Sequence, residues 1–178
     1  MSKLFWGMVF LFFNFNIFLF IVNINLFPDF VGYILIILGV KELLRQSKHF
    51  KQIYPISITM LVLSIIYLVT NLLMIEINAI ISGIISIAFM AMFMFLLCKI
   101  ILGIKDMEKN DDRNYKTGLL YILWIALTAA TGITYSCALI PNLSNLTYVT
   151  TSLSIANAVI FVAFMIAFFI SKKEYESY

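Results

Sequence analysis

Long apolar segments separated by short polar connections dominate the chain. Six of them have the length of about 20 residues that an α-helix needs to cross a hydrocarbon core about 30 Å thick. They cover residues 4–22, 26–44, 56–75, 79–98, 119–140 and 151–170. No charged residue lies in the middle of any of them. The pattern therefore predicts an all-α, six-helix transmembrane bundle that forms a single integral membrane domain over residues 1–178.

The second segment is the weakest of the six. Its uninterrupted apolar run extends only from Phe30 to Val40, and the full range includes Asp29, Lys41 and Glu42 near its ends. A lysine at a helix end can extend its ammonium group to the lipid headgroups, and Asp29 suits the positive end of the helix dipole. We expect a full crossing, with a re-entrant segment as the alternative.

The placement of lysine and arginine predicts the orientation. All 12 lie in the N-terminus, in or beside the second and fourth connections, or in the C-terminal tail. They are Lys3, Lys41, Arg45, Lys48, Lys51, Lys99, Lys105, Lys109, Arg113, Lys116, Lys172 and Lys173. The connections near Asp29, near Glu76 and from Pro141 to Val149 contain none. Because basic residues concentrate in cytoplasmic loops, six crossings with both termini in the cytoplasm fit this distribution.

Composition excludes an ordinary soluble domain. Hydrophobic residues make up 63% of the chain and charged residues 12%, about half the charged share of a typical soluble protein. The apolar residues outnumber any core that 178 residues could enclose. Most of them are therefore expected to face lipid.

Groups that could carry chemistry are few. Cys98 and Cys137 lie in apolar runs without metal-ligand spacing, and we interpret them as small buried hydrophobes. The only histidine, His49, lies among basic residues, where solvation is its ordinary state. Residues 106–114 are expected to form a charged loop whose mixed signs indicate solvation rather than an anionic-lipid site. We therefore expect no enzyme activity, no metal or other cofactor, and no nucleic-acid partner.

Polar residues near the outer ends of the predicted helices form the one candidate site. They are Asn23, Asn25, Asp29, Tyr33, Asn71 and Asn157. An amide in hydrocarbon costs free energy unless it has a partner, so these asparagines, together with Asn14 and Asn16, should face other helices or water. One interpretation is a polar cleft that binds a neutral or cationic solute. The alternative is that each group is satisfied separately by another helix or by backbone carbonyls.

Small residues mark faces where helices could approach closely. Gly32 and Gly39 are seven residues apart and share a helical face. Ala79 and Gly83, and Thr128 and Gly132, lie four residues apart on later segments. Such spacing favours close helix packing in lipid. We expect packing within the molecule, with an interface to another subunit as the alternative.

The segment LFPDFVGYILIIL, residues 26–38, carries a resemblance. It resembles a PDF-(I/V)-GY-I-L signature of small multipass membrane proteins of Gram-positive bacteria, in which the signature follows a first apolar helix. Trp6-Gly7 and residues 10–12 look like the lead-in of that helix, so the resemblance covers roughly residues 5–45. It implies a bacterial plasma membrane and a similar architecture, and it implies no activity.

Two functions follow as hypotheses. The first is a small solute-binding or transport-associated membrane subunit. Its size and topology are similar to those of the substrate-capturing subunits of energy-coupling-factor vitamin transporters, although its first segment lacks their Ala-x-x-x-Ala contact face. The second is a non-catalytic accessory or structural subunit of another membrane complex. Besides the lipid bilayer, the expected partner is another membrane protein or a second copy of the chain.

Overall fold

The structure is a computed structural model that describes residues 1–12, 16–19, 22–25, 29–73, 79–139 and 147–177. For some of these it describes the backbone alone: residues 12, 16–19, 22–25, 71–72, 79–80, 137–139 and 147–150.

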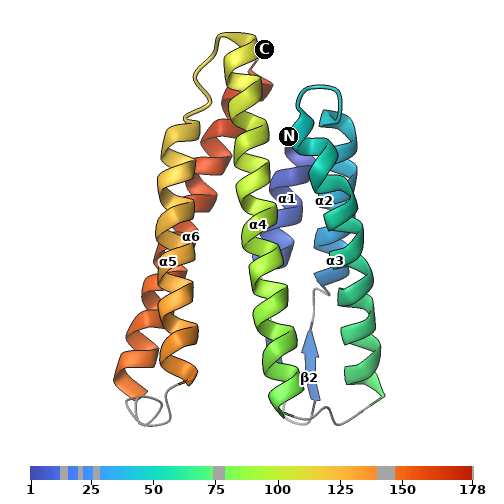
Figure 1. Cartoon of the computed structure of the whole chain (residues 1–178), viewed down its shortest axis with the longest axis vertical. Helices are drawn as coiled ribbons and strands as arrows, with labels where there is room; N and C mark the ends of the chain where they lie inside the picture. Colours follow the sequence, from blue (N-terminus) through green and yellow to red (C-terminus); the bar gives the residue numbers. More distant parts are fainter. Residues whose placement is uncertain (13–15, 20–21, 26–28, 74–78, 140–146, 178) are drawn as a thin grey trace. The chain divides into compact units, whose positions relative to one another are not determined.

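Six helices account for most of the described chain (Figure 1). They are α1 (Ser2–Phe12), α2 (Asp29–Leu43), α3 (Lys48–Leu72), α4 (Ala79–Asp111), α5 (Thr117–Leu139) and α6 (Thr147–Glu176). By length and composition, α3, α4, α5 and α6 can each cross a membrane. The chain is therefore a membrane protein, and the predicted helical class is confirmed. The six crossings and their orientation stay predictions.

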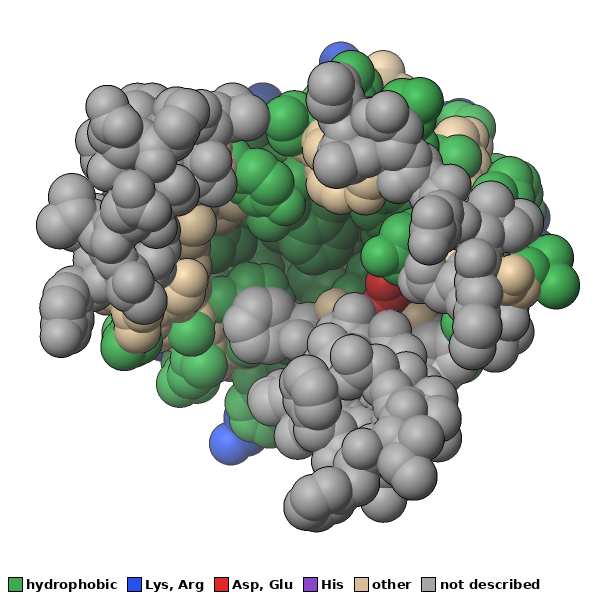
Figure 2. Space-filling model, turned by 90° about the horizontal axis from the view of Figure 1, so that it is seen from below, with side chains coloured by type: hydrophobic (Ala, Val, Ile, Leu, Met, Phe, Trp, Pro, Cys, Tyr) green, Lys and Arg blue, Asp and Glu red, His purple; other side chains and the backbone are tan. Residues whose placement is uncertain are grey.

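Contacts between residues divide the chain into two compact units, Met1–Asp111 and Asp112–Tyr178. The first contains α1 to α4 and the second contains α5 and α6. Large apolar side chains on these helices are exposed, as expected for surfaces that lipid covers in a membrane protein. Ile84 and Val159 are each 63% exposed, and Ile122 is 64% exposed. Figure 2, which views the lower end of Figure 1, shows mainly hydrophobic and few charged side chains among the described residues.

The segment expected to be one helix over residues 4–22 is divided in the structure. α1 ends at Phe12, and an antiparallel hairpin follows, made of β1 (Asn16–Leu19) and β2 (Val22–Asn25). Its register pairs Asn16 with Asn25 and Leu19 with Val22. Asparagine is a poor helix former, whereas isoleucine, phenylalanine and valine favour strands. The apolar length of the segment predicted a crossing but could not distinguish a helix from a helix followed by strands.

Glycines bring α1 and α2 into close contact. A Cβ atom on Gly7 would lie 2.8 Å from the carbonyl oxygen of Gly32. One on Gly39 would lie 2.7 Å from the backbone nitrogen of Leu4. A side chain at any of these positions would therefore push the two helices apart. The prediction that Gly32 and Gly39 share a face where a neighbouring helix approaches is confirmed, and that helix is α1.

The later helices extend beyond the apolar segments that predicted them. α3 begins at Lys48 rather than at residue 56, and α4 continues to Asp111. The expectation of a charged loop over residues 106–114 is therefore wrong for residues 106–111. Methionine, glutamate and lysine in this stretch are good helix formers, so the helix continues after its apolar part ends. Phe50 of α3 packs against α4 here, because a Cβ on Gly103 would lie 2.7 Å from its ring.

Candidate functional site

The structure places two of the six predicted cleft residues next to each other. Asp29 is the first residue of α2, and Tyr33 lies one turn later. The side chain of Tyr33 is 2% exposed. Its ring packs edge to face against Phe89 of α4, with 6.2 Å between the ring centroids and 72° between the planes. Tyr33 thus links α2 to α4 inside the first unit.

Three further cleft residues are described by their backbone alone. Asn23 and Asn25 lie in β2, directly before α2, and Asn71 is next to the last residue of α3. Their side chains lie outside the described part of the structure, as do those of Asn14 and Asn16. The convergence of these groups on one cavity therefore stays a prediction.

Asn157, the sixth cleft residue, connects α6 to α5. Its Nδ2 donates to Oγ1 of Thr134 at 2.8 Å, and its Oδ1 accepts from Oγ1 of Thr131 at 3.3 Å. The hydroxyl of Thr134 in turn donates to the carbonyl of Ala130 at 2.9 Å. Both ends of the amide are thus paired within the second unit. These contacts agree with the alternative interpretation of Asn157, in which the polar group is satisfied by another helix and not by a solute.

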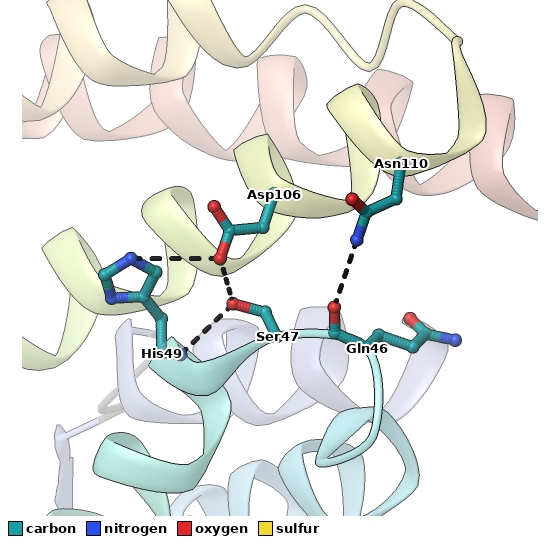
Figure 3. Close-up of polar contacts among 5 residues, drawn as sticks. All are labelled: Gln46, Ser47, His49, Asp106 and Asn110. Carbon is teal, nitrogen blue, oxygen red and sulfur yellow. Dashed lines mark hydrogen bonds and ion pairs between the residues drawn. The ribbon is translucent and has the colours of Figure 1, made fainter.

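A second polar cluster joins the turn between α2 and α3 to α4 (Figure 3). Ser47 directly precedes α3, and its Oγ accepts a hydrogen bond from the backbone N–H of His49 at 3.1 Å, which is an N-cap. The same hydroxyl donates to Oδ2 of Asp106 at 2.5 Å. One turn further along α4, Asn110 donates from Nδ2 to the carbonyl of Gln46 at 3.5 Å.

His49 lies at the edge of this cluster. Its Nε2 is 3.9 Å from Oδ2 of Asp106, the oxygen that also accepts from Ser47. Its Nδ1 is buried and has no hydrogen-bond partner among the described residues. The expectation of a fully solvated loop histidine is therefore wrong, because only 17% of its side chain is exposed.

The geometry of the cluster suits a structural clamp rather than a nucleophile. In a Ser-His-Asp triad, the serine hydroxyl is bonded to the imidazole and the carboxylate orients that imidazole. Here the hydroxyl of Ser47 donates to Asp106, and its oxygen caps α3. Its proton and one of its two lone pairs are therefore already used. Hydrogen bonds to charged groups contribute about 1.5–3 kcal/mol each, so this clamp stabilises the α3–α4 contact.

Sequence reasoning missed this cluster because it assigned residues 106–114 to a loop. In a helix, the four-residue spacing of Asp106 and Asn110 places both on one face. A serine directly before Lys48 is also a signal for a helix start at that point, well before the apolar stretch. Both signals are visible in the sequence, but their pairing across 59 residues is not.

Known proteins add no family and no activity. Comparison with protein-family models, with curated proteins and with solved structures finds no match to this chain. Within the described ranges, no group of three or more His, Cys, Asp or Glu side chains could hold a metal ion.

Proposed function

We propose that this chain is a polytopic protein of the bacterial plasma membrane and serves as a small, non-catalytic solute-binding or transport-associated subunit. The proposal includes six crossings with both termini in the cytoplasm. The distribution of all 12 basic residues supports the orientation. The resemblance of residues 5–45 to small multipass proteins of Gram-positive bacteria supports the location.

The early end of α1 carries this proposal. With 11 residues, α1 is about 16 Å long, which is half of a hydrocarbon core. Each four-residue strand of the hairpin adds about 13 Å. A helix followed by a strand, and a strand followed by α2, therefore have the lengths of two crossings. In this arrangement the hairpin occupies the outer half of the membrane.

Non-helical backbone at that depth supports a binding role. Backbone N–H and C=O groups in lipid must be paired, so strands with open edges occur there only when protein buries them or when they line a water-filled cavity. Membrane carriers place solute sites at such discontinuous helices. Asn23 and Asn25 lie in this stretch, and Asp29 begins the next element, α2. Amides and one carboxylate suit a neutral or cationic solute.

Mass spectrometry of the purified protein tests the proposal. We expect the mildly solubilised chain to retain a small polar or cationic molecule, and Asp29→Asn or Asn25→Leu to lower its occupancy. Asp112→Asn is the matched control, because Asp112 is an exposed residue of the α4–α5 connection. Equal occupancy in all variants, or no retained molecule in the unaltered protein, would refute solute binding at this site.

One observation favours the accessory-subunit alternative. Apart from the adjacent residues and the nearby backbone of the same helix, no described atom lies within 4 Å of a Cβ placed on Gly83 of α4 or Gly132 of α5. No described neighbouring helix of the same unit therefore covers these two positions, which supports their use in an interface with another protein. A stoichiometric protein partner, or a second copy of the chain, in the same mass spectrometry experiment without a small molecule would support this alternative.

A further inference from the structure

A pocket lies in the second unit, between the connection before α5 and the end of α6. It has a volume of about 280 Å³ and is lined by Arg113, Asn114, Tyr115, Lys116 and Glu174. All five residues belong to Asp112–Tyr178. Two lining side chains are cationic, one is anionic, and the other two can form hydrogen bonds. The pocket therefore offers partners for both signs of charge within a small space.

Local contacts fix the chain around this pocket. Asp112 and Lys116 have left-handed backbone conformations, with φ of 53° and 56°. The side-chain oxygen of Asn114 accepts the backbone N–H of Lys116 at 2.9 Å. Tyr115 is 1% exposed, and its ring contacts that of Tyr175 on α6 with 6.1 Å between centroids. The lining connection is thus anchored to α6 by an aromatic pair.

Two of the lining residues, Lys116 and Glu174, follow the apolar parts of α5 and α6 at the distance expected for the lipid headgroups. The apolar stretch of α5 begins at Leu119, three residues after Lys116, and that of α6 ends at Ile170, four residues before Glu174. At 1.5 Å per helical residue, each lies about 5–6 Å beyond the apolar part. The headgroup layer extends about 5–8 Å beyond the hydrocarbon core on each side. A membrane lipid can therefore reach the pocket without leaving the bilayer.

The charges in the pocket define the headgroup. We infer that it binds a phospholipid headgroup that combines a phosphodiester with a primary ammonium group, as in phosphoethanolamine. Arginine and lysine are phosphate-binding side chains, which suits Arg113 and Lys116. The carboxylate of Glu174 complements the ammonium group. An anionic headgroup without an amine would instead bring its phosphate close to Glu174 and leave that carboxylate unpaired.

Lys172, a neighbouring basic residue of α6, is not among the residues that line the pocket. Lys172 lies 3.6 Å from a carboxylate oxygen of Glu176, and its ammonium group is 5.8 Å from the centre of the Phe169 ring. Both of these contacts lie within α6. The site is independent of the solute-binding role proposed for the first unit, so either proposal can fail without the other.

Native mass spectrometry of the full chain tests this site. The protein is mixed with equal amounts of phosphatidylethanolamine and phosphatidylglycerol that have the same acyl chains. We expect phosphatidylethanolamine to be retained preferentially. Glu174→Gln should lower the phosphatidylethanolamine to phosphatidylglycerol ratio about two- to fivefold, the size of one exposed ion pair. Arg113→Gln and Lys116→Gln should lower binding of both lipids.

Two controls keep the result specific. Lys109→Gln removes an exposed basic residue of α4 that does not line the pocket, and it should change neither lipid. An unchanged lipid ratio in Glu174→Gln, or an equal loss of binding in Lys109→Gln and Arg113→Gln, would overturn the site. Free phosphoethanolamine that displaces the lipid at the same concentration would overturn a membrane lipid as the source. Failure of the free compound to compete supports a lipid held in the bilayer.

Discussion

At the scale of single residues, glycines determine how closely α1 and α2 approach, because they have no side chain. Gly7 and Gly32 lie opposite each other, and a Cβ on either would meet backbone oxygen of the other helix at 2.8–2.9 Å. Contacts between backbone atoms cannot be relieved by a rotamer change. Glycine is therefore required here by the packing of two helices and not by a turn.

Substitution of Gly7 tests this packing. Gly7→Ala should lower the free energy of unfolding by about 1–3 kcal/mol, because overpacking forces the helices apart. Gly132→Ala is the matched control, since no described atom outside the nearby turns of α5 lies within 4 Å of its Cβ position. There alanine should be neutral or stabilising by up to about 1 kcal/mol through its higher helix propensity. Equal effects of the two substitutions in detergent-unfolding titrations would contradict close packing at Gly7.

The polar contact between α5 and α6 is the second residue-scale prediction. Asn157→Leu and Thr134→Val each remove one side of a 2.8 Å hydrogen bond. Interhelical hydrogen bonds in membrane proteins contribute about 0.6 kcal/mol on average, and we expect a coupling energy of that size in a double-mutant cycle. A coupling energy of zero would mean that the amide and the hydroxyl do not act as a pair.

At the scale of elements, side-chain contacts join the start of α3 to α4 and also join α1 to α2. Ser47 caps α3 and also bonds Asp106 of α4, while Lys3 of α1 pairs with Glu42 at the end of α2. The Lys3–Glu42 pair is about half exposed, so its contribution is small. The serine clamp is the stronger link, because one hydroxyl satisfies both a helix terminus and a carboxylate.

Removal of this hydroxyl should loosen the start of α3. Ser47→Ala loses an N-cap and a bond to a charged group, with a cost of about 1–3 kcal/mol. Hydrogen exchange at the amides of His49 and Phe50 should become faster. Ser86→Ala is the control, because the hydroxyl of Ser86 bonds only the carbonyl of Ser82 in its own helix. Unchanged exchange in Ser47→Ala would exclude the clamp.

At the scale of the whole molecule, the number of crossings depends on whether the α1–hairpin–α2 segment passes through the whole bilayer. With six crossings, α1 and β1 together form the first crossing, and β2 and α2 together form the second. If the α1–hairpin–α2 segment were re-entrant, α3 to α6 would still cross and both termini would still share one side. Loops later in the chain therefore test the orientation, whereas position 21 tests the number of crossings.

Cysteine labelling in intact cells separates these cases. In a variant without Cys98 and Cys137, single cysteines at positions 78 and 145 should react with an impermeant reagent, and those at 48 and 111 should not. A cysteine at position 21 should also react if six crossings are present. Labelling at 78 and 145 without labelling at 21 would favour a re-entrant α1–hairpin–α2 segment, in which neither α1 nor α2 crosses. Labelling at 48 would exclude the proposed orientation.

The sequence alone determined that this is a helical membrane protein, and it located all four of the long helices. The hydrophobic contributions of the residues in a segment add up. A run of about 20 apolar residues therefore predicts a position in lipid without knowledge of the segments that pack against it. The same local reasoning identified Gly32 and Gly39 as a packing face. It also placed Asp29 and Tyr33 near the outer end of the same predicted helix.

Only the tertiary structure decided which distant residues meet. Residues 4–22 are apolar throughout their length apart from asparagines, yet the chain leaves the helix after Phe12. The pairing of Ser47 with Asp106, and of Asn157 with Thr134, joins residues from different helices. Such contacts depend on how far each helix extends and on how its face is rotated toward the next. A shift of one residue in the end of a helix or in its rotation changes which side chains meet. Hydropathy alone therefore cannot predict these contacts.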